Sequence, residues 1–238
     1  MNILKKYITS SKEGGISVNN LPIKTKELFD VDIPFLKETF EASTYPWEIL
    51  PQIKEIVKKI LETGLEGYHE LEPGILVGEN VKIAKTATIE APAIIGKDTE
   101  LRPGAYLRGN VIIGERCVIG NSSELKNAIL LTHVQVPHYN YVGDSILGNN
   151  AHMGAGSILS NLKSNGQNVV IHAEKEYETG LRKIGSFLGD GADIGCGSVL
   201  NPGTIIGKNT QVYPLSMLRG CFPSNCIVKS QSMIVEKI

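Results

Sequence analysis

The chain has 238 residues, of which 42% are hydrophobic and only 6% aromatic, and its formal net charge is −1. This length and hydrophobic content suffice for one sizeable core, or for one core with a small appendage. The near-neutral charge argues against a protein that binds the phosphates of a nucleic acid backbone.

Segment composition narrows the class of protein further. No run of about 18 apolar residues is present, so we expect no membrane span. The first six residues lack the apolar centre of a signal peptide. Four cysteines are too few for a disulfide scaffold in a chain of this length. We therefore expect a soluble, cytoplasmic protein in a reducing compartment.

Residues 1–70 are expected to form an N-terminal segment. Residues 1–45 carry little pattern, and their role stays open. A helix is predicted over about 51–63, where Pro51 suits its first turn and Gly64 its end. Its apolar positions have helical spacing and are Ile53, Ile56, Val57, Ile60 and Leu61. No Gly-rich phosphate-binding loop occurs before residue 75.

From Val77 onward an aliphatic residue recurs at every sixth position. The first run is Val77, Ile83, Ile89, Ile95, Leu101, Leu107, Ile113, Ile119, Leu125 and Leu131. The repeat resumes in a shifted phase at Leu147, Met153 and Leu159, and again at Leu188, Ile194, Leu200, Ile206, Val212 and Leu218. A six-residue unit can be a short strand and a corner, with Gly and Asn at corners. Stacked units place like side chains in ladders about 4.8 Å apart.

This repeat resembles the hexapeptide-repeat family, in which three hexapeptides make one triangular coil. The resemblance implies an all-β fold, a left-handed parallel β-helix over residues 71–230, with a short α-helical N-terminal segment. The left hand follows from the resemblance alone, because the crossover rule for parallel strands favours the right hand. The two interruptions of the repeat predict loops near 132–142 and 160–184, and long loops on a rigid scaffold often carry function.

A second motif accompanies the interruptions: Val136-Pro137-His138-Tyr139-Asn140-Tyr141-Val142-Gly143-Asp144, followed by Gly154-Ala155-Gly156 and Asn161. With the stretch Pro46-Trp47-Glu48-Ile49-Leu50, it resembles the acetyltransferase half of bifunctional UDP-N-acetylglucosamine pyrophosphorylase/glucosamine-1-phosphate acetyltransferases, especially the archaeal type. The likeness covers roughly residues 45–218. The nucleotidyltransferase half is missing, so UDP transfer is not expected on this chain.

The resemblance implies a role for each matching residue. His138 matches the catalytic base. Tyr141 and Asn161 match residues that hold the amino sugar, and Arg108, Lys126 and Lys183 match the cationic groups around its phosphate. Ala155 and Cys196 match positions on the coenzyme A side, where Ser is usual in place of Cys196. The resemblance also implies a homotrimer with sites between subunits and acetyl-CoA as co-substrate. We expect no metal site.

The chemistry of these residues fits acetyl transfer. A histidine titrates near neutrality and can take the proton of an attacking amine or hydroxyl. Arginine and lysine pair with phosphate, and backbone N–H groups at corner 154–156 can face the developing oxyanion. We predict an acetyl-CoA-dependent acetyltransferase acting on an amino-sugar phosphate or a nucleotide amino sugar. His152 and Leu162 stand where the family commonly has Asn and Tyr, so the acceptor and the choice between N- and O-acetylation stay open.

Two other functions fit the same sequence. The missing nucleotidyltransferase half is compatible with a non-catalytic scaffold or a regulatory subunit, with or without a separate nucleotidyltransferase partner. Hexapeptide-repeat carbonic anhydrases bind zinc through two histidines five residues apart and a third upstream. The chain has His133 and His138, but its one upstream histidine is His69, and catalytic zinc sites typically have three protein ligands.

Overall fold

The six-residue repeat winds into a parallel β-helix of triangular coils, in a computed structural model that describes residues 21–237. One repeat position per coil enters each ladder: Val77, Ile95 and Ile113 pair in register on one face of the prism. These side chains are almost fully buried and form one core with the ladders of the other two faces. The structure thus confirms the predicted β-helix.

The chain meets three faces in each coil, which we call the first, second and third face. The first consists of β2 (Ile75–Gly78), β5 (Ala93–Ile95), β8 (Val111–Ile113), β17 (Ser186–Leu188), β20 (Thr204–Ile206) and β23 (Cys221–Phe222). The second consists of β3 (Lys82–Ile83), β6 (Glu100–Leu101), β9 (Val118–Asn121), β11 (Gln135–His138), β13 (His152–Met153), β18 (Asp193–Ile194), β21 (Gln211–Val212) and β24 (Cys226–Ser230). The third consists of β4 (Thr88–Glu90), β7 (Tyr106–Arg108), β14 (Ile158–Leu159), β19 (Val199–Leu200) and β22 (Met217–Leu218).

Two longer strands bend from the third face onto the first, and antiparallel strands close both ends of the prism. The bent strands are β10 (Glu124–Leu130) and β12 (Tyr141–Leu147), and each turns at a residue of positive φ, Asn127 at 47° and Asp144 at 48°. At one end β1 (Tyr68–Glu72) pairs antiparallel with β2, and at the other β25 (Met233–Glu236) pairs with β24. The antiparallel strands pair with the terminal coils, whose free edges would otherwise attract other chains.

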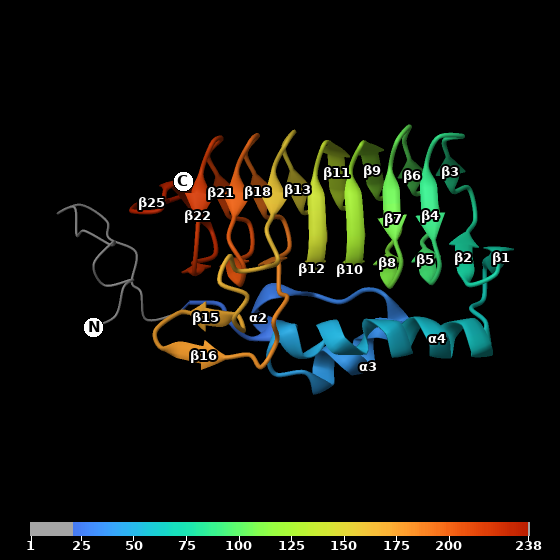
Figure 1. Cartoon of the computed structure of the whole chain (residues 1–238), viewed down its shortest axis with the longest axis horizontal. Helices are drawn as coiled ribbons and strands as arrows, with labels where there is room; N and C mark the ends of the chain where they lie inside the picture. Colours follow the sequence, from blue (N-terminus) through green and yellow to red (C-terminus); the bar gives the residue numbers. More distant parts are fainter. Residues whose placement is uncertain (1–20, 238) are drawn as a thin grey trace.

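The winding is left-handed. In Figure 1 the strands of the third face, such as β7, run downward at the front, while those of the second face, such as β9, run upward behind them. The coils advance from right to left as the chain proceeds. A turn in this sense combined with this advance defines a left-handed helix, as the resemblance implied.

A helical segment covers most of the first face (Figure 1). It contains α2 (Thr25–Leu28), α3 (Pro34–Ala42), the 3-10 helices η2 (Pro46–Glu48) and η3 (Leu50–Gln52), and α4 (Ile53–Thr63). In α4 the buried side chains Ile53, Val57 and Ile60 lie on one side, and Gly64 ends the helix at φ 74°. They form a second core with an outward-facing ladder of the first face: Leu76, Ile94, Ile112, Ile129, Ile146, Phe187, Ile205 and Cys221.

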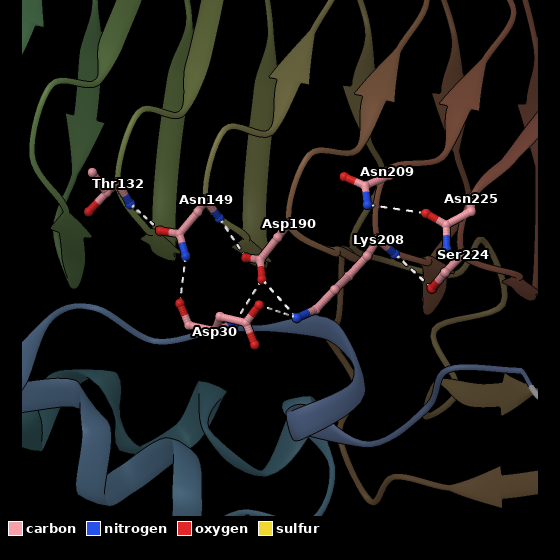
Figure 2. A network of polar contacts seen from close by, with 8 residues as sticks. All are labelled: Asp30, Thr132, Asn149, Asp190, Lys208, Asn209, Ser224 and Asn225. Atoms are coloured by element: carbon pink, nitrogen blue, oxygen red, sulfur yellow. Dashed lines mark hydrogen bonds and ion pairs between the residues drawn. The ribbon is translucent and has the colours of Figure 1, made fainter. Parts of the chain in front are cut away.

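A polar cluster fastens this segment to the prism (Figure 2). Lys208 Nζ lies 2.6 Å from Asp30 Oδ2 and 3.1 Å from Asp190 Oδ2. The other carboxylate oxygen of Asp190 accepts the backbone N–H of Asn149 at 2.8 Å, and the Asn149 side-chain amide donates to the Asp30 carbonyl oxygen at 2.6 Å. Burial raises the pKa of Asp190, and hydrogen bonds from Asp30 and Asn149 oppose that rise. The loop after α2 is therefore joined to three successive coils.

In place of the loop expected near 132–142, the prism continues through β11. Val136 pairs with Ile119, 17 residues earlier, and Leu130 pairs with Leu147 at the same spacing. The repeat slips because the corner between Leu125 and Leu130 is one residue shorter than its predecessor. Leu130 therefore occupies the inner ladder, and Leu131, which the six-residue count selects, packs in the second core instead.

The second interruption does leave the prism, between β14 and β17. It contains the hairpin of β15 (Val170–His172) and β16 (Glu176–Glu178). The hairpin lies beside the helical segment (Figure 1) and contributes Val169, Ile171 and Ala173 to the second core. The covered first face is thus completed by two segments far apart in the sequence.

Candidate functional site

His138, Ala155 and Cys196 occupy successive corners of one edge, where the second face turns into the third. The His138 carbonyl oxygen accepts the backbone N–H of Gly156 at 3.0 Å, and the Ala155 carbonyl oxygen accepts that of Gly197 at 2.8 Å. The Cys196 carbonyl oxygen accepts the N–H of Leu215 at 2.9 Å. Adjacent corners are about one strand spacing apart, roughly 4.8 Å. The structure therefore lines up the predicted base and the predicted coenzyme A positions.

A buried asparagine holds the corner of His138. Asn140 is 2% exposed, and its Oδ1 accepts the backbone N–H of His138 at 3.1 Å. Its Nδ2 donates to the carbonyl oxygens of Gly154 at 2.9 Å and Ser157 at 3.3 Å, in the next coil. The imidazole of His138 is exposed and has no hydrogen-bond partner within residues 21–237. Asn140 thus fixes the backbone from which the predicted base projects.

Tyr141 and Asn161 come together on the third face, near its edge with the first. Asn161 Nδ2 donates to Tyr141 Oη at 3.2 Å and to Asp144 Oδ2 at 2.6 Å. The other Asp144 oxygen accepts from Asn127 Nδ2 at 2.9 Å. Burial, followed by the carboxylates of Glu124 and Asp144, raises the pKa of Tyr141, which keeps the phenol protonated at neutral pH. The two residues predicted to hold the sugar form one hydrogen-bonded pair.

The structure places two of the predicted phosphate-binding residues, Arg108 and Lys126, on neighbouring strands and the third, Lys183, at the insertion. Arg108 Nη1 lies 2.6 Å from Glu124 Oε1, and this hydrogen bond raises the pKa of the guanidinium. Glu124 in turn stands in register with Tyr141, and Lys126 stands in register with Gly143. Lys183 lies at the neck of the insertion, opposite Leu162 in an antiparallel bridge. Neither lysine ammonium has an ion-pair partner among the described residues.

Two of the three backbone N–H groups expected to face an oxyanion at corner 154–156 already have acceptors in the protein. Gly154 N–H already donates to the Ile194 carbonyl oxygen at 2.7 Å, and Gly156 N–H to that of His138. Both are occupied because they join successive coils. Within the described part of the chain, the N–H of Ala155 donates to no acceptor, so it is the donor of this corner that can meet a ligand.

Sequence reasoning missed three residues that organise the site: Asn140, Gly143 and Asp144. A Cβ on Gly143 would lie 2.6 Å from Tyr141 Oη and 2.7 Å from Asn161 Nδ2, so only glycine leaves room for that pair. Asp144 belongs to a column of polar corner residues 17 positions apart: Asn110, Asn127, Asp144 and Asn161. This spacing is visible in the sequence, but it becomes a signal only once the coil length of 17 is known.

Other side chains singled out by the sequence lie apart from these groups. His138 ends β11, and His133 lies in the turn before that strand. The structure of residues 21–237 holds no group of three or more His, Cys, Asp or Glu placed to bind a metal ion. His152 Nδ1 lies 2.8 Å from Asp193 Oδ1 on the second face. The thiols of Cys117, Cys221 and Cys226 are buried, while that of Cys196 is exposed.

A cleft of about 440 Å³ lies between the 3-10 helices and the hairpin. Tyr45, Trp47 and Tyr177 line it, together with Glu48 and Lys175, and none of the predicted site residues does. No helix in the described part of the chain combines the length and the apolar character that crossing a bilayer requires.

Comparison with known proteins agrees with the sequence motif. Residues 89–176 match the family described as the GMPPB C-terminal domain. The "Bifunctional protein GlmU" of Methanococcus aeolicus is 30% identical over 210 residues, which are 81% of this chain and 47% of that protein. The "Bifunctional sugar-1-phosphate nucleotidylyltransferase/acetyltransferase" of Sulfurisphaera tokodaii is 32% identical over 151 residues, 58% of this chain and 38% of that protein.

The chain spans about half the length of the GlmU proteins that it matches. Among solved structures, a putative acetyltransferase of Bacillus cereus is 17% identical, with a TM-score of 0.38 over 68% of this chain and 77% of the other. In sequence, the chain resembles a GlmU-like acetyltransferase domain over most of its length.

Proposed function

From this GlmU-like sequence, we propose that the chain is an acetyltransferase that moves the acetyl group of acetyl-CoA onto the amine of a sugar phosphate or nucleotide sugar. One observation carries the proposal: the corner column of His138, Ala155 and Cys196 runs beside the face that holds Tyr141 and Asn161. A thioester lying along the edge would meet an acceptor on that face next to the imidazole of His138.

The proposed reaction needs one proton acceptor and one oxyanion donor. The amine nitrogen attacks the thioester carbonyl carbon, forming the new C–N bond, and the C–S bond breaks as the thiolate of coenzyme A leaves. The imidazole of His138 takes the amine proton and can pass it to that thiolate. The free N–H of Ala155 supports stabilisation of the developing oxyanion, because hydrogen bonds aimed at new charge favour the transition state.

The cationic groups support an anionic acceptor. Lys126 and Lys183 hold no carboxylate among the described residues, so both ammonium groups can approach a phosphate. Arg108 is held by Glu124 at 2.6 Å through Nη1, and its other N–H groups stay available for a bidentate contact. Glucosamine 1-phosphate carries its amine and its phosphate on neighbouring carbons of one sugar ring, and it is the acceptor that we would try first.

We also propose that the active assembly is a homotrimer with the site between subunits. The exposed imidazole of His138 has no partner in its own chain within residues 21–237, and a neighbouring subunit can supply one. Light scattering of the purified protein should give three times the chain mass of 25.8 kDa. A monomer at working concentration would contradict this assembly.

The decisive experiment follows coenzyme A release by mass spectrometry with acetyl-CoA and glucosamine 1-phosphate. Wild type should turn over, and His138→Ala should lower kcat by about 10²–10⁴-fold, the usual effect of removing a general base. His133→Ala, in the turn before β11, should leave the rate unchanged. Equal rates for wild type and His138→Ala would remove the assigned role of His138.

A non-catalytic scaffold is the second candidate, favoured by the ion pair that engages Arg108. Titration calorimetry distinguishes the two functions without turnover. The acetyltransferase should bind acetyl-CoA, whereas a protein that binds neither acetyl-CoA nor glucosamine 1-phosphate would be a scaffold.

A further inference from the structure

The structure assigns Asp144 as the positioning residue that decides which atoms of Tyr141 and Asn161 meet the acceptor. This inference rests on the proposed function and concerns the same site. Asp144 is 6% exposed and lies at the corner where β12 bends from the third face to the first. It touches no proposed ligand itself and acts through Asn161.

Hydrogen-bond chemistry fixes the orientation of Asn161. A carboxylate only accepts hydrogen bonds, so the side chain of Asn161 must turn Nδ2 toward Asp144 Oδ2, 2.6 Å away. The second Nδ2 proton goes to Tyr141 Oη at 3.2 Å. Both protons of the amide are then used. Asn161 Oδ1 is left to accept a hydrogen bond, since no donor among the described residues reaches it.

The same bond fixes the polarity of Tyr141. Its oxygen already accepts from Asn161, and within the described part of the chain its own O–H proton has no acceptor. The pair therefore presents one donor, the phenol of Tyr141, beside one acceptor, Oδ1 of Asn161. An amine beside a hydroxyl is complementary, because the amine N–H donates to Asn161 and the hydroxyl oxygen accepts from Tyr141.

Asp144 also holds both ends of the inserted hairpin segment. Its side chain binds Asn161, where the chain leaves the prism, and its carbonyl oxygen accepts the N–H of Gly185 at 2.7 Å, where the chain returns. The N–H of Ile184 donates to the Asn161 carbonyl oxygen at 3.0 Å. Lys183, the proposed phosphate ligand, comes directly before Ile184 in the chain. One corner residue thus positions the sugar pair and the base of the phosphate-binding lysine.

The neighbouring coil offers a matched control. Asn127 donates to the other oxygen of Asp144 at 2.9 Å, so Asn127→Ala removes a hydrogen bond of the same kind. It leaves the bond to Asn161 in place. Asp144→Asn is the test variant, in which residue 144 has one oxygen and one amide. While Asn127 keeps donating to that oxygen, the amide faces Asn161, which must then rotate and present Nδ2 to the acceptor.

The kinetic experiment measures KM for each substrate separately. Asp144→Asn should raise the KM for glucosamine 1-phosphate by up to about 10-fold, the loss expected for one hydrogen bond to the acceptor, and leave the KM for acetyl-CoA unchanged. The double variant D144N/N161D restores an amide–carboxylate pair with the roles exchanged and should recover part of the acceptor KM. Asn127→Ala should lower stability while leaving both KM values unchanged. An unchanged acceptor KM in Asp144→Asn would overturn the assignment. So would an acceptor KM that rises equally in Asp144→Asn and in Asn127→Ala.

A second readout needs no turnover. In protein with ¹⁵N-labelled asparagine, the side-chain amide protons of Asn161 should exchange slowly with water, and faster in Asp144→Asn. If wild type neither binds nor acetylates glucosamine 1-phosphate, the proposed function fails, and this exchange rate alone decides the orienting role. Equal exchange in the two proteins would show that Asp144 does not hold Asn161.

Discussion

The side-chain oxygen of Asn140 accepts the backbone N–H of His138 at 3.1 Å, while the amide of the same side chain donates to Gly154 in the next coil. A buried side chain thus joins the predicted base to the corner that carries Ala155. The position of His138 therefore depends on a residue that is itself almost fully buried.

Replacing Asn140 by alanine should weaken both folding and activity. The change leaves the backbone N–H of His138 without its acceptor, which typically costs about 1–3 kcal/mol of unfolding free energy, whereas the carbonyl oxygen of Gly154 still accepts from Ser157. We expect a lower urea midpoint and a reduced kcat with acetyl-CoA, because the corner of His138 loosens. A variant as stable and as active as wild type would show that Asn140 holds nothing essential.

Gly143→Ala should impair acceptor binding with little effect on folding. Its Cβ would meet the ends of two side chains, Tyr141 Oη and Asn161 Nδ2, which can move aside. The KM for glucosamine 1-phosphate should rise while the melting temperature stays within a few degrees. The measurement is steady-state kinetics paired with calorimetry.

Gly120→Ala is the instructive contrast. There the added Cβ would lie 1.5 Å from the carbonyl oxygen of Pro137, which is backbone of the next coil. Because a backbone cannot step aside as a side chain can, we expect little folded protein. A folded, cooperative Gly120→Ala would contradict the close coil contact.

Lys208→Met should loosen the helical segment from the prism. The variant leaves the carboxylates of Asp30 and Asp190 next to each other without their ammonium group. We expect a loss of about 1–2 kcal/mol in unfolding free energy and faster proteolysis within residues 21–64. Lys58→Met makes the control, because its pair with Glu62 is exposed and 4.0 Å long, and such pairs contribute under about 0.5 kcal/mol.

Alkaline pH should destabilise the fold through Cys117. Burial raises the pKa of its thiol to about 12, whereas an unfolded thiol titrates near 8.5. The unfolded state therefore loses the proton first, so stability falls as pH rises from about 9 toward 12, by up to roughly 1.4 kcal/mol per pH unit. Urea unfolding at pH 8 and 10.5 should show this fall in wild type, and a smaller one in Cys117→Ala.

Thiol labelling should count one reactive cysteine per native chain. Cys196 is exposed, and the other three cysteines are buried. A disulfide reagent should modify one thiol in the native protein and all four after denaturation. More than one fast-reacting thiol in the native protein would contradict the burial of the core cysteines.

The six-residue period sufficed to place most of the inner ladders, because one aliphatic per strand must face the core. It failed at the short corner, where Leu130 and Leu131 are both apolar and only the backbone turn at Asn127 selects between them. The second core could also be predicted in part from the sequence. Neighbouring aliphatics such as Ile94-Ile95 and Ile112-Ile113 point to opposite sides of a strand, so both sides of the first face must be buried.

Some residues of the candidate site could be predicted from the sequence, and others could not. His138, Ala155 and Cys196 were found through motif likeness, and the structure brings them to one edge. Asn140 and Asp144 were missed because their roles are contacts between coils, which have no sequence signature without the register. The engagement of Arg108 by Glu124 likewise depends on which residues face outward on adjacent rungs.

A triangular prism has three sides and three edges, and here the described chain already occupies one side with its own helices and hairpin. Two sides remain open, and they meet along a single edge. That edge is the one bearing His138, Ala155 and Cys196. A trimer that packs through these two open sides would place the edge at the boundary between subunits and remove the imidazole of His138 from bulk water.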